Sequence, residues 1–429
     1  MKKLTPLFIL VVIAGSCWFS VSAAAADLGD FGQFNGFADA RYGARLQSDS
    51  YQKQTALAET RLQLGLFRMG GSSTLQLRAD FYYDDVVEQK SVDLEEGNGW
   101  IDLREANLLF SPHSLVDLKV GRQILTWGTG DLLFVNDLFP KDWQAFFIGR
   151  DVEYLKAPSD AVLISLFPGW FNIDIVYTPR FDPDRYIRGE RLSYWNPGLN
   201  RIAGRDAVVS PSTPDRWFSD DEIALRLTKN INGYETALYF YDGYWKSPVG
   251  FDPLAATALF PRLSVYGASL RGNLGPGVAH LEMGYYDSRH DRSGDDPLLP
   301  NSEWRFLAGY EQEVVRNVTL AGQYYLEALQ RYDAYESTTL AATARDPYRH
   351  LVTLRLTWLM LNQNLNLSLF CYYSPTDADI YLRPALKYKL TDAWQLSAGA
   401  NIFYGRYDHT FFAQFNQNTN LYTGVRYSF

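Results

Sequence analysis

Apolar and polar residues alternate along most of the chain with a period of two. In the stretch LAETRLQLGLF, for example, Leu62, Leu64 and Leu66 alternate with polar residues and glycine. The same pattern recurs in STLQLRADFYY, EIALRLTK, NVTLAGQYYLE, HLVTLRLTW, NLNLSLFCYY and DIYLRPALKYK. Because successive side chains of a β-strand point to opposite faces, this alternation predicts strands with one apolar and one polar face. We therefore expect an all-β protein.

Three features favour a transmembrane β-barrel over a soluble β-sandwich, whose strands would also alternate. The alternating segments are about 10–14 residues long, which suits tilted strands that cross a bilayer. The connections between them are short and long in turn, and aromatic residues crowd the segment ends, as in YFYDGYW and FCYY. Such aromatic girdles mark the two interfaces of a membrane barrel. The chain therefore predicts a closed antiparallel transmembrane β-barrel.

The connections also indicate the number of strands. Eight short turns, such as RMGGSS, KNING and NLGPG, alternate with nine longer segments, which separates about eighteen strands. The longer segments are 47–54, 86–98, 126–158, 179–218, 246–259, 290–301, 332–347, 374–378 and 408–418. We predict an even strand number, sixteen to eighteen, with short periplasmic turns, long external loops and both termini on the periplasmic side.

Residues 1–26 have the features of a cleaved secretory signal peptide: two lysines, an apolar run, and small residues in SAAAAD before Asp27. A single membrane anchor is the alternative, but the apolar run is short and interrupted. A lipoprotein signal ending at Cys17 is a further alternative, and the residues before this cysteine fit it poorly. We expect one mature barrel domain, 27–429, with too few residues before its first strand for a plug domain.

The chain ends in NLYTGVRYSF, an alternating strand whose last residue is Phe429. This ending resembles the terminal recognition strand of bacterial outer-membrane proteins. The resemblance implies insertion by the barrel-assembly machinery into the outer membrane of a Gram-negative bacterium. An ordinary edge strand is the alternative.

Composition excludes several kinds of site. Apart from the signal segment only Cys371 remains, so no disulfide framework is expected. The five histidines are far apart in sequence, and none forms a pair with metal-ligand spacing. The chain has a formal charge of -9 but 29 Tyr, 26 Phe and 11 Trp, in keeping with aromatic girdles. We expect no metal, no cofactor and no nucleic-acid partner.

The polar phase of the strands gives a prediction of what lines the lumen. In that phase basic residues outnumber acidic ones, whereas acids collect in presumed external loops such as DLEEGN and DRSGDD. Lumen rings of one charge sign set pore selectivity, which favours an anionic permeant; alternatively, paired charges simply stabilise a solvated wall. The basic residues predicted to line the pore or to contact the permeant are Arg41, Arg45, Arg61, Arg78, Lys119, Arg122, Arg226, Arg271, Arg305, Arg355, Arg383, Lys387 and Arg426.

Two long connections are candidates for covering or narrowing the lumen. Segment 126–158 is too apolar for a free loop and too interrupted for a strand, so we predict a constriction loop; an external hairpin is the alternative. Its candidate site residues are Trp127, Asp131, Asp137, Lys141, Asp142 and Arg150. Segment 179–218, which contains Trp195 and Trp217, is the candidate lid loop.

The stretch VGRQILTWGTGD, which leads into the constriction loop, is not a phosphate loop because it lacks the Lys-Ser/Thr ending. Alternation would turn Arg122 toward lipid, where a charge is costly. We therefore predict a bulge at Gly121–Arg122 that turns Arg122 into the lumen. Gly128 and Gly130 then let the chain bend away from the wall, with Arg122 and Trp127 as anchors.

The same region carries a family resemblance. LREANLLF at 103–110, followed by LKVGRQILTWGTGD at 118–131, resembles the strand pair and G-R-Q-x-x-x-W-G element of alginate-export-type and related porin-like outer-membrane barrels. The resemblance covers about 50 residues. It implies a large monomeric barrel, rather than a trimer, with a conduit role and an anionic polymer or small acid as permeant.

These observations together predict an outer-membrane channel for passive or facilitated passage of small hydrophilic solutes, anionic by preference, or of an anionic polymer. The alternative is a non-catalytic barrel that sheathes or anchors a partner protein of a secretion or electron-transfer complex. We expect no enzyme, because the sequence contains no G-x-S-x-G and no convincing Ser–His pair.

Overall fold

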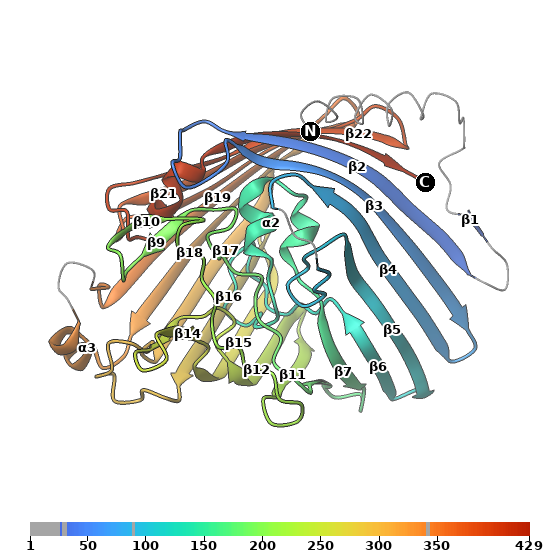
Figure 1. The fold of residues 1–429 in the computed structure, drawn as a ribbon. Helices are drawn as coiled ribbons and strands as arrows, with labels where there is room; N and C mark the ends of the chain where they lie inside the picture. Colours follow the sequence, from blue (N-terminus) through green and yellow to red (C-terminus); the bar gives the residue numbers. More distant parts are fainter. Residues whose placement is uncertain (1–25, 28–31, 88–90, 340–343) are drawn as a thin grey trace.

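The computed structural model describes residues 26–27, 32–87, 91–339 and 344–429 (Figure 1). The predicted signal peptide, apart from its last residue, lies outside the described residues. In the described part of the chain, no helix is both long and apolar enough to cross a membrane.

Eighteen antiparallel strands form one closed barrel, and the last of them pairs with the first of them. The prediction of an even strand number between sixteen and eighteen is therefore confirmed. The barrel strands are β2 (Gln33–Arg45), β3 (Thr55–Gly70), β4 (Ser73–Asp84), β5 (Ile101–His113), β6 (Val116–Gln123), β7 (Ser159–Leu166), β8 (Asn172–Thr178), β11 (Glu222–Ile231), β12 (Tyr234–Tyr244), β15 (Arg262–Leu274), β16 (Gly277–Ser288), β17 (Glu303–Val315), β18 (Val318–Leu329), β19 (Tyr348–Met360), β20 (Leu365–Ser374), β21 (Asp379–Lys389), β22 (Trp394–Gly405) and β23 (Asn420–Ser428).

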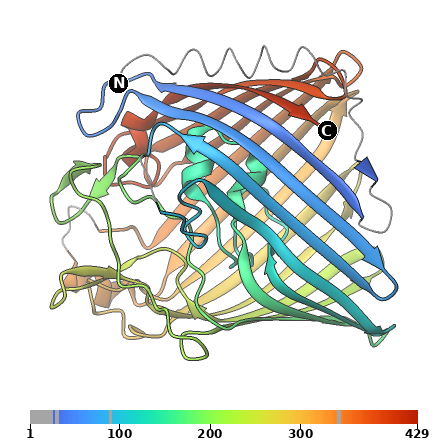
Figure 2. The same cartoon turned by 45° about the vertical axis from the view of Figure 1, so that its right-hand side comes forward.

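Short turns join the strands at one end of the barrel and longer loops at the other, as predicted (Figures 1 and 2). Phe429 lies at the short-turn end, where its backbone bonds to Gly36 at the start of β2. The remaining small elements are β1 (Ala26–Asp27), which pairs with β2, and, in the loops, α2 (Trp143–Ile148), η2 (Val152–Leu155), β9 (Tyr194–Asn196), β10 (Arg201–Ala203), β13 (Gly250–Asp252), β14 (Thr257–Leu259), α3 (Tyr332–Thr338) and η3 (Ala413–Asn418).

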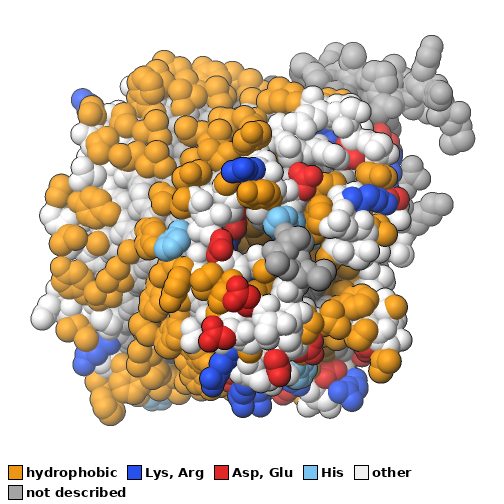
Figure 3. Space-filling model, turned by 90° about the vertical axis from the view of Figure 1, so that its left-hand side faces the viewer, with side chains coloured by type: hydrophobic (Ala, Val, Ile, Leu, Met, Phe, Trp, Pro, Cys, Tyr) orange, Lys and Arg blue, Asp and Glu red, His pale blue; other side chains and the backbone are white. Residues whose placement is uncertain are grey.

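Alternation along each strand separates an apolar outer face from a polar lumen. In β19, Leu354 and Leu356 on one face are 46% and 39% exposed, whereas Thr353, which precedes them on the opposite face, is buried. A lipid-facing surface has to be apolar, and inward positions are free to be polar, so the period-two pattern follows from the barrel itself. Figure 3 shows hydrophobic side chains spread over the outer wall.

The hydrophobic core lies inside the barrel, between the wall and the segment that joins β6 to β7. Phe147 of α2 is surrounded by Tyr381 of β21, Phe403 of β22 and Phe415 of η3, with ring centroids 4.8–5.4 Å apart. All four rings are almost fully buried. Aromatic pairs at this spacing add about 0.5–1.5 kcal/mol each beyond their buried area, so this cluster fixes α2 against the wall.

The bulge predicted at Gly121–Arg122 is wrong. Both residues pair in regular register with β5 and with β7, and Arg122 shares a face with the exposed Val120. The register shift lies in β5 instead, where Arg104 is the extra residue opposite β4. Arg122 is nevertheless buried. Near the loop end of the strands it forms a 2.7 Å ion pair with Asp160 at the start of β7. The charge is compensated locally instead of being turned into the lumen.

Candidate functional site: the segment that crosses the lumen

Residues 124–158, which we call the crossing segment, leave the wall after β6 and return to it at β7 (Figures 1 and 2). Along the way they contact wall strands on opposite sides of the barrel: β16 and β19 through Thr129 and Asp131, and β3 through Arg150. The predicted constriction loop, 126–158, falls within this segment. Its alternative, an external hairpin with a cluster of its own, does not describe these contacts.

A single carboxylate of the wall holds the Gly-Thr-Gly turn of the crossing segment. Glu282 of β16 accepts hydrogen bonds through Oε1 from the backbone nitrogens of Thr129 and Gly130 and from the Thr129 hydroxyl. Through Oε2 it accepts two more, from the backbone nitrogen and the side-chain amide of Asn136. The sequence of this turn does not match a phosphate loop, but the turn does bind an anion. That anion is the carboxylate of Glu282 in the same chain. We call this arrangement the Glu282 cradle.

Glycine is required at each of the two positions of the turn for a different structural reason. Gly128 has φ +80°, a left-handed conformation that disfavours a side chain, and a Cβ there would lie 3.2 Å from both oxygens of Glu282. A Cβ on Gly130 would lie 2.3 Å from the carbonyl oxygen of Leu133 and 2.6 Å from Leu307. The predicted bend at these glycines is thus required for the close approach to Glu282.

Asp131 extends the attachment to the next strands. Its carboxylate forms a 2.6 Å ion pair with Arg355 of β19, and its backbone exchanges two hydrogen bonds with the side chain of Gln323 of β18. Burial raises the pKa of Asp131 above its usual value, while the nearby Arg355 opposes that rise.

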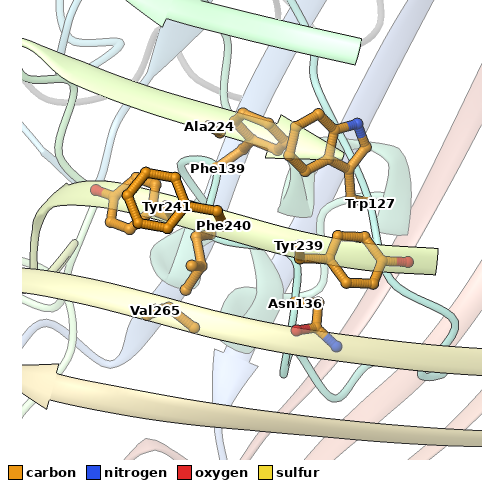
Figure 4. Close-up of a pocket in the computed structure, with 9 residues that line it drawn as sticks. Trp127, Asn136, Phe139, Ala224, Tyr239, Phe240, Tyr241 and Val265 are labelled. Carbon is orange, nitrogen blue, oxygen red and sulfur yellow. The ribbon is translucent and has the colours of Figure 1, made fainter. Parts of the chain in front are cut away.

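Trp127 packs into a small cavity of the wall near β11 and β12, on the same side of the barrel as β16 (Figure 4). Its ring lies edge-on to Phe139 at 4.9 Å and close to Tyr239 of β12 at 6.1 Å. The guanidinium of Arg226 on β11 sits 5.2 Å from the centroid of the same ring. Asn136, Tyr241 and Val265 complete the surroundings of this small cavity. The aromatic packing fixes the start of the crossing segment to β11 and β12.

The second half of the crossing segment is held by charges. Asp142 caps α2 by accepting from the backbone nitrogen of Ala145, and Asp137 pairs with Lys141 at 3.0 Å. Arg150 reaches Glu59 of β3 at 2.6 Å. Asp137, Lys141, Asp142 and Arg150 are all among the predicted constriction residues.

Asp151 and Tyr154 continue these contacts around the barrel. Asp151 lies 2.7 Å from Lys387 of β21 and 3.8 Å from Arg41 of β2. Burial raises the pKa of Asp151, but the cations of Lys387, Arg426 and Arg41 together outweigh it and hold the pKa below its usual value. The Tyr154 ring lies 4.4 Å beneath the guanidinium of Arg61.

The predicted lid loop, 179–218, packs on the crossing segment and on the neighbouring loops. Arg185 forms two 2.8 Å bonds to Asp102 of β5, and Asp184 accepts from the backbone of Lys141 and from the Trp143 indole. Burial raises the pKa of Asp184 despite these hydrogen bonds. The lid loop and the crossing segment therefore form one packed unit at the loop end of the barrel.

Most of the predicted basic residues have a carboxylate partner. Those with an ion pair within 4.0 Å are Arg41, Arg61, Arg78, Arg122, Arg226, Arg305, Arg355, Lys387 and Arg426. Among the described residues, no carboxylate lies that close to Arg45, Lys119, Arg271 or Arg383. Arg45 instead donates to the backbone carbonyl of Lys53 at 2.5 Å.

The expectation that bases outnumber acids in the lumen needs correction. The register also turns inward several carboxylates that the sequence-derived set left out: Asp102, Glu105, Asp174, Glu222, Glu282, Glu303 and Glu327. Several of these are the partners of the predicted arginines, so the wall is closer to charge balance than a basic ladder. Glu282 is the most consequential omission. Its alternation with Leu281 and Met283 signals an inward position, but nothing in the sequence indicates which loop it binds.

Comparison with protein-family models finds no match, and comparison with curated protein sequences finds none either. Solved structures do resemble the fold. Pseudomonas aeruginosa OccD3 (OpdP) aligns with TM-score 0.52 and 10% identity over 97% of this chain and 96% of that chain. P. aeruginosa OccK11 (OpdR) aligns with TM-score 0.52 and 9% identity over 92% and 95%. The outer membrane channel DcaP of Acinetobacter baumannii gives TM-score 0.45 and 11% identity over 95% and 100%. The chain therefore shares the closed β-barrel fold of OccD3 and OccK11.

Proposed function

We propose that the protein is a passive channel in the outer membrane of a Gram-negative bacterium, and that the crossing segment is its constriction. The observation that carries the proposal is the Glu282 cradle, because it fixes a long, partly apolar segment across a polar lumen. Functional loops held by a rigid scaffold are a common way to place a selective site. The fold shared with OccD3 and OccK11 supports the channel reading.

We further propose that small hydrophilic anions are preferred. Arg383 of β21 supports this preference, because no described carboxylate lies within 4.0 Å of it and its guanidinium rests 3.8 Å from the ring centroid of Phe146. A stacked guanidinium keeps its N–H donors available for a carboxylate or phosphate. Among the predicted pore-lining residues, Arg45, Lys119 and Arg271 are the other cations with no described carboxylate that close. The paired arginines contribute little net charge to the preference.

The crossing segment favours a small solute over a polymer and a channel over a sheath. A folded partner inside the lumen would have to share it with residues 124–158, which already reach opposite walls. A role in alginate export therefore rests only on the resemblance of residues 103–110 and 118–131. The same proposal includes insertion of the barrel into the outer membrane by the barrel-assembly machinery, which recognises the strand ending at Phe429, and a monomeric state.

The test is planar-bilayer conductance of the purified barrel, with the reversal potential measured in a salt gradient. We expect stable single-channel currents and a reversal potential displaced toward the equilibrium potential of the anion. A reversal potential on the cation side would contradict the anion preference while leaving the channel intact. Absence of conductance from barrels shown to be folded would contradict the channel itself and favour a sheath or anchor.

A further inference from the structure

A large cavity lies on the loop side of the crossing segment. Its volume is about 1770 Å³, and we call it the vestibule. Its lining includes crossing-segment residues from Leu132 to Phe147 together with parts of the lid loop, the β13–β14 hairpin and the loop that carries η3. In Figure 3, which shows the side where Figure 1 labels α3 and β9, hydrophobic, charged and histidine side chains lie together around the centre of the face. A solute entering from the loop side meets this cavity before the constriction.

The lining of the vestibule combines charged side chains with a large share of apolar ones. Beside the aromatic side chains it contains exposed aliphatic and aromatic groups, among them Val249 at 47%, Phe411 at 44%, Phe251 at 43% and Val208 at 41% exposure. Contiguous exposed apolar surface of this kind marks a binding site more often than an inert surface.

The charges of the vestibule are largely neutralised within the protein. Glu303 pairs with Arg305 at 2.6 Å and with Arg345 at 3.2 Å, and Arg349 pairs with Asp377 at 2.5 Å. These residues lie together where β17 and β19 reach the loops. Much of the charge in this part of the lining is therefore compensated within the protein.

We infer that the vestibule is a binding site for solutes with an apolar body, and that the permeants of this channel are amphipathic organic acids. The hydrocarbon body binds the vestibule, and the acidic group is selected at the constriction. The second half of this inference rests on the proposed anion channel. The binding of the apolar body in the vestibule depends only on the apolar residues that line it, because burial of hydrocarbon surface is favourable whatever the charge of the solute.

The β13–β14 hairpin offers a matched pair of variants. Phe251 lines the vestibule, whereas Leu254, at the tip of the same hairpin, is 98% exposed and does not. Both side chains are accessible, so neither substitution removes a buried core group. Phe251→Ser makes the lining polar at one point, and Leu254→Ser makes a comparable change outside the cavity.

The experiment is equilibrium dialysis of 2-naphthoate, 2-naphthol and gluconate against the protein in nanodiscs, with empty nanodiscs subtracted. We expect both naphthyl probes to be retained at least about ten-fold better than gluconate, Phe251→Ser to weaken their binding by roughly three- to ten-fold, and Leu254→Ser to match the wild type. Equal retention of naphthoate and gluconate, or equal effects of the two variants, would overturn the site. Dialysis does not require conduction, so it tests the vestibule site separately from the channel. A cation-side reversal potential would contradict the anion channel and the assignment of organic acids as permeants, but it would not contradict the vestibule site.

Discussion

The carboxylate of Glu282 lies 2.7 Å from the backbone nitrogen of Gly130, although the two residues are 152 positions apart in the chain. This contact is one of five hydrogen bonds that the crossing segment donates to the carboxylate of Glu282, which takes the place of a bound anion. Backbone N–H groups around a tight glycine turn form a natural anion cavity. Here that cavity is filled by the protein itself, so the crossing segment is held in place without a ligand.

Removing this carboxylate should loosen the crossing segment. In Glu282→Gln the amide nitrogen cannot accept, so at least one set of donors loses its partner, at a cost of about 1–3 kcal/mol. We expect noisier open-channel current and a higher mean conductance in planar bilayers. Glu311→Gln is the control, because Glu311 is an exposed, inward-facing carboxylate of the neighbouring strand β17. Equal current noise in the two variants would contradict the role of Glu282.

A methyl group on Gly130 should disturb the same turn from the other side. Its Cβ would lie 2.3 Å from the carbonyl oxygen of Leu133, which the fixed backbone cannot easily avoid. Forcing a methyl group into such a packed site costs about 1–3 kcal/mol. We expect Gly130→Ala to make residues 128–136 more sensitive to added protease. Gly70→Ala is the control, since no atom lies within 4 Å of its Cβ position, and equal protease sensitivity would refute the account.

Arg383 should set part of the charge selectivity. Its guanidinium rests on Phe146 without a carboxylate partner within 4.0 Å among the described residues, so its loss removes an uncompensated lumen charge. Arg383→Gln should move the reversal potential in a salt gradient toward the cation side. Lys229→Gln removes the same charge from the outer face of β11 and should leave the reversal potential where it is in the wild type. The preference would need another origin if both variants behaved alike.

Asp184 gives the packed loops a pH dependence of known sign. Burial raises its pKa in the folded state, so in the pH window that opens above the ordinary aspartate pKa of about 4 the unfolded chain releases a proton that the folded chain keeps. The contribution of Asp184 to stability is therefore greatest in acid and falls as the pH rises through this window. Asp184→Asn does not lose stability in this way, because the asparagine side chain does not titrate. Its thermal stability relative to wild type should improve from about pH 4 to about pH 7.

The control for this pH series is Asp215→Asn, which removes an exposed carboxylate from the same loop. The stability of this variant relative to wild type should change little across the same range. A constant difference between Asp184→Asn and wild type, or one that worsens with rising pH, would show that the burial of Asp184 does not control the loop packing.

The barrel could be predicted from the sequence because its rules are local. Each strand reveals its two faces through period-two alternation, and short turns differ in composition from long loops, so strand number and connection pattern follow from residues such as those of LAETRLQLGLF. The glycine bend within the crossing segment could be predicted for the same reason.

The partners of the lumen charges could not be predicted, since they depend on which strands face each other across the barrel. Arg122 illustrates this: strand phase alone indicated an unpaired charge toward lipid, whereas Asp160, 38 residues away, compensates it in regular pairing. Glu282 is similar, because its phase was readable but its loop partner was not. A set of inward arginines chosen without their carboxylates therefore overstated the basic character of the lumen.

The most direct test of the central claim, that the crossing segment sets the conductance of the channel, is to replace residues 128–156 with a short Gly-Ser linker. The strands on either side pair with their own neighbours, so the barrel should still fold, which heat-modifiable migration in gels verifies. We predict a several-fold rise in single-channel conductance together with a weaker anion preference. A folded variant whose conductance equals that of the wild type would contradict the account.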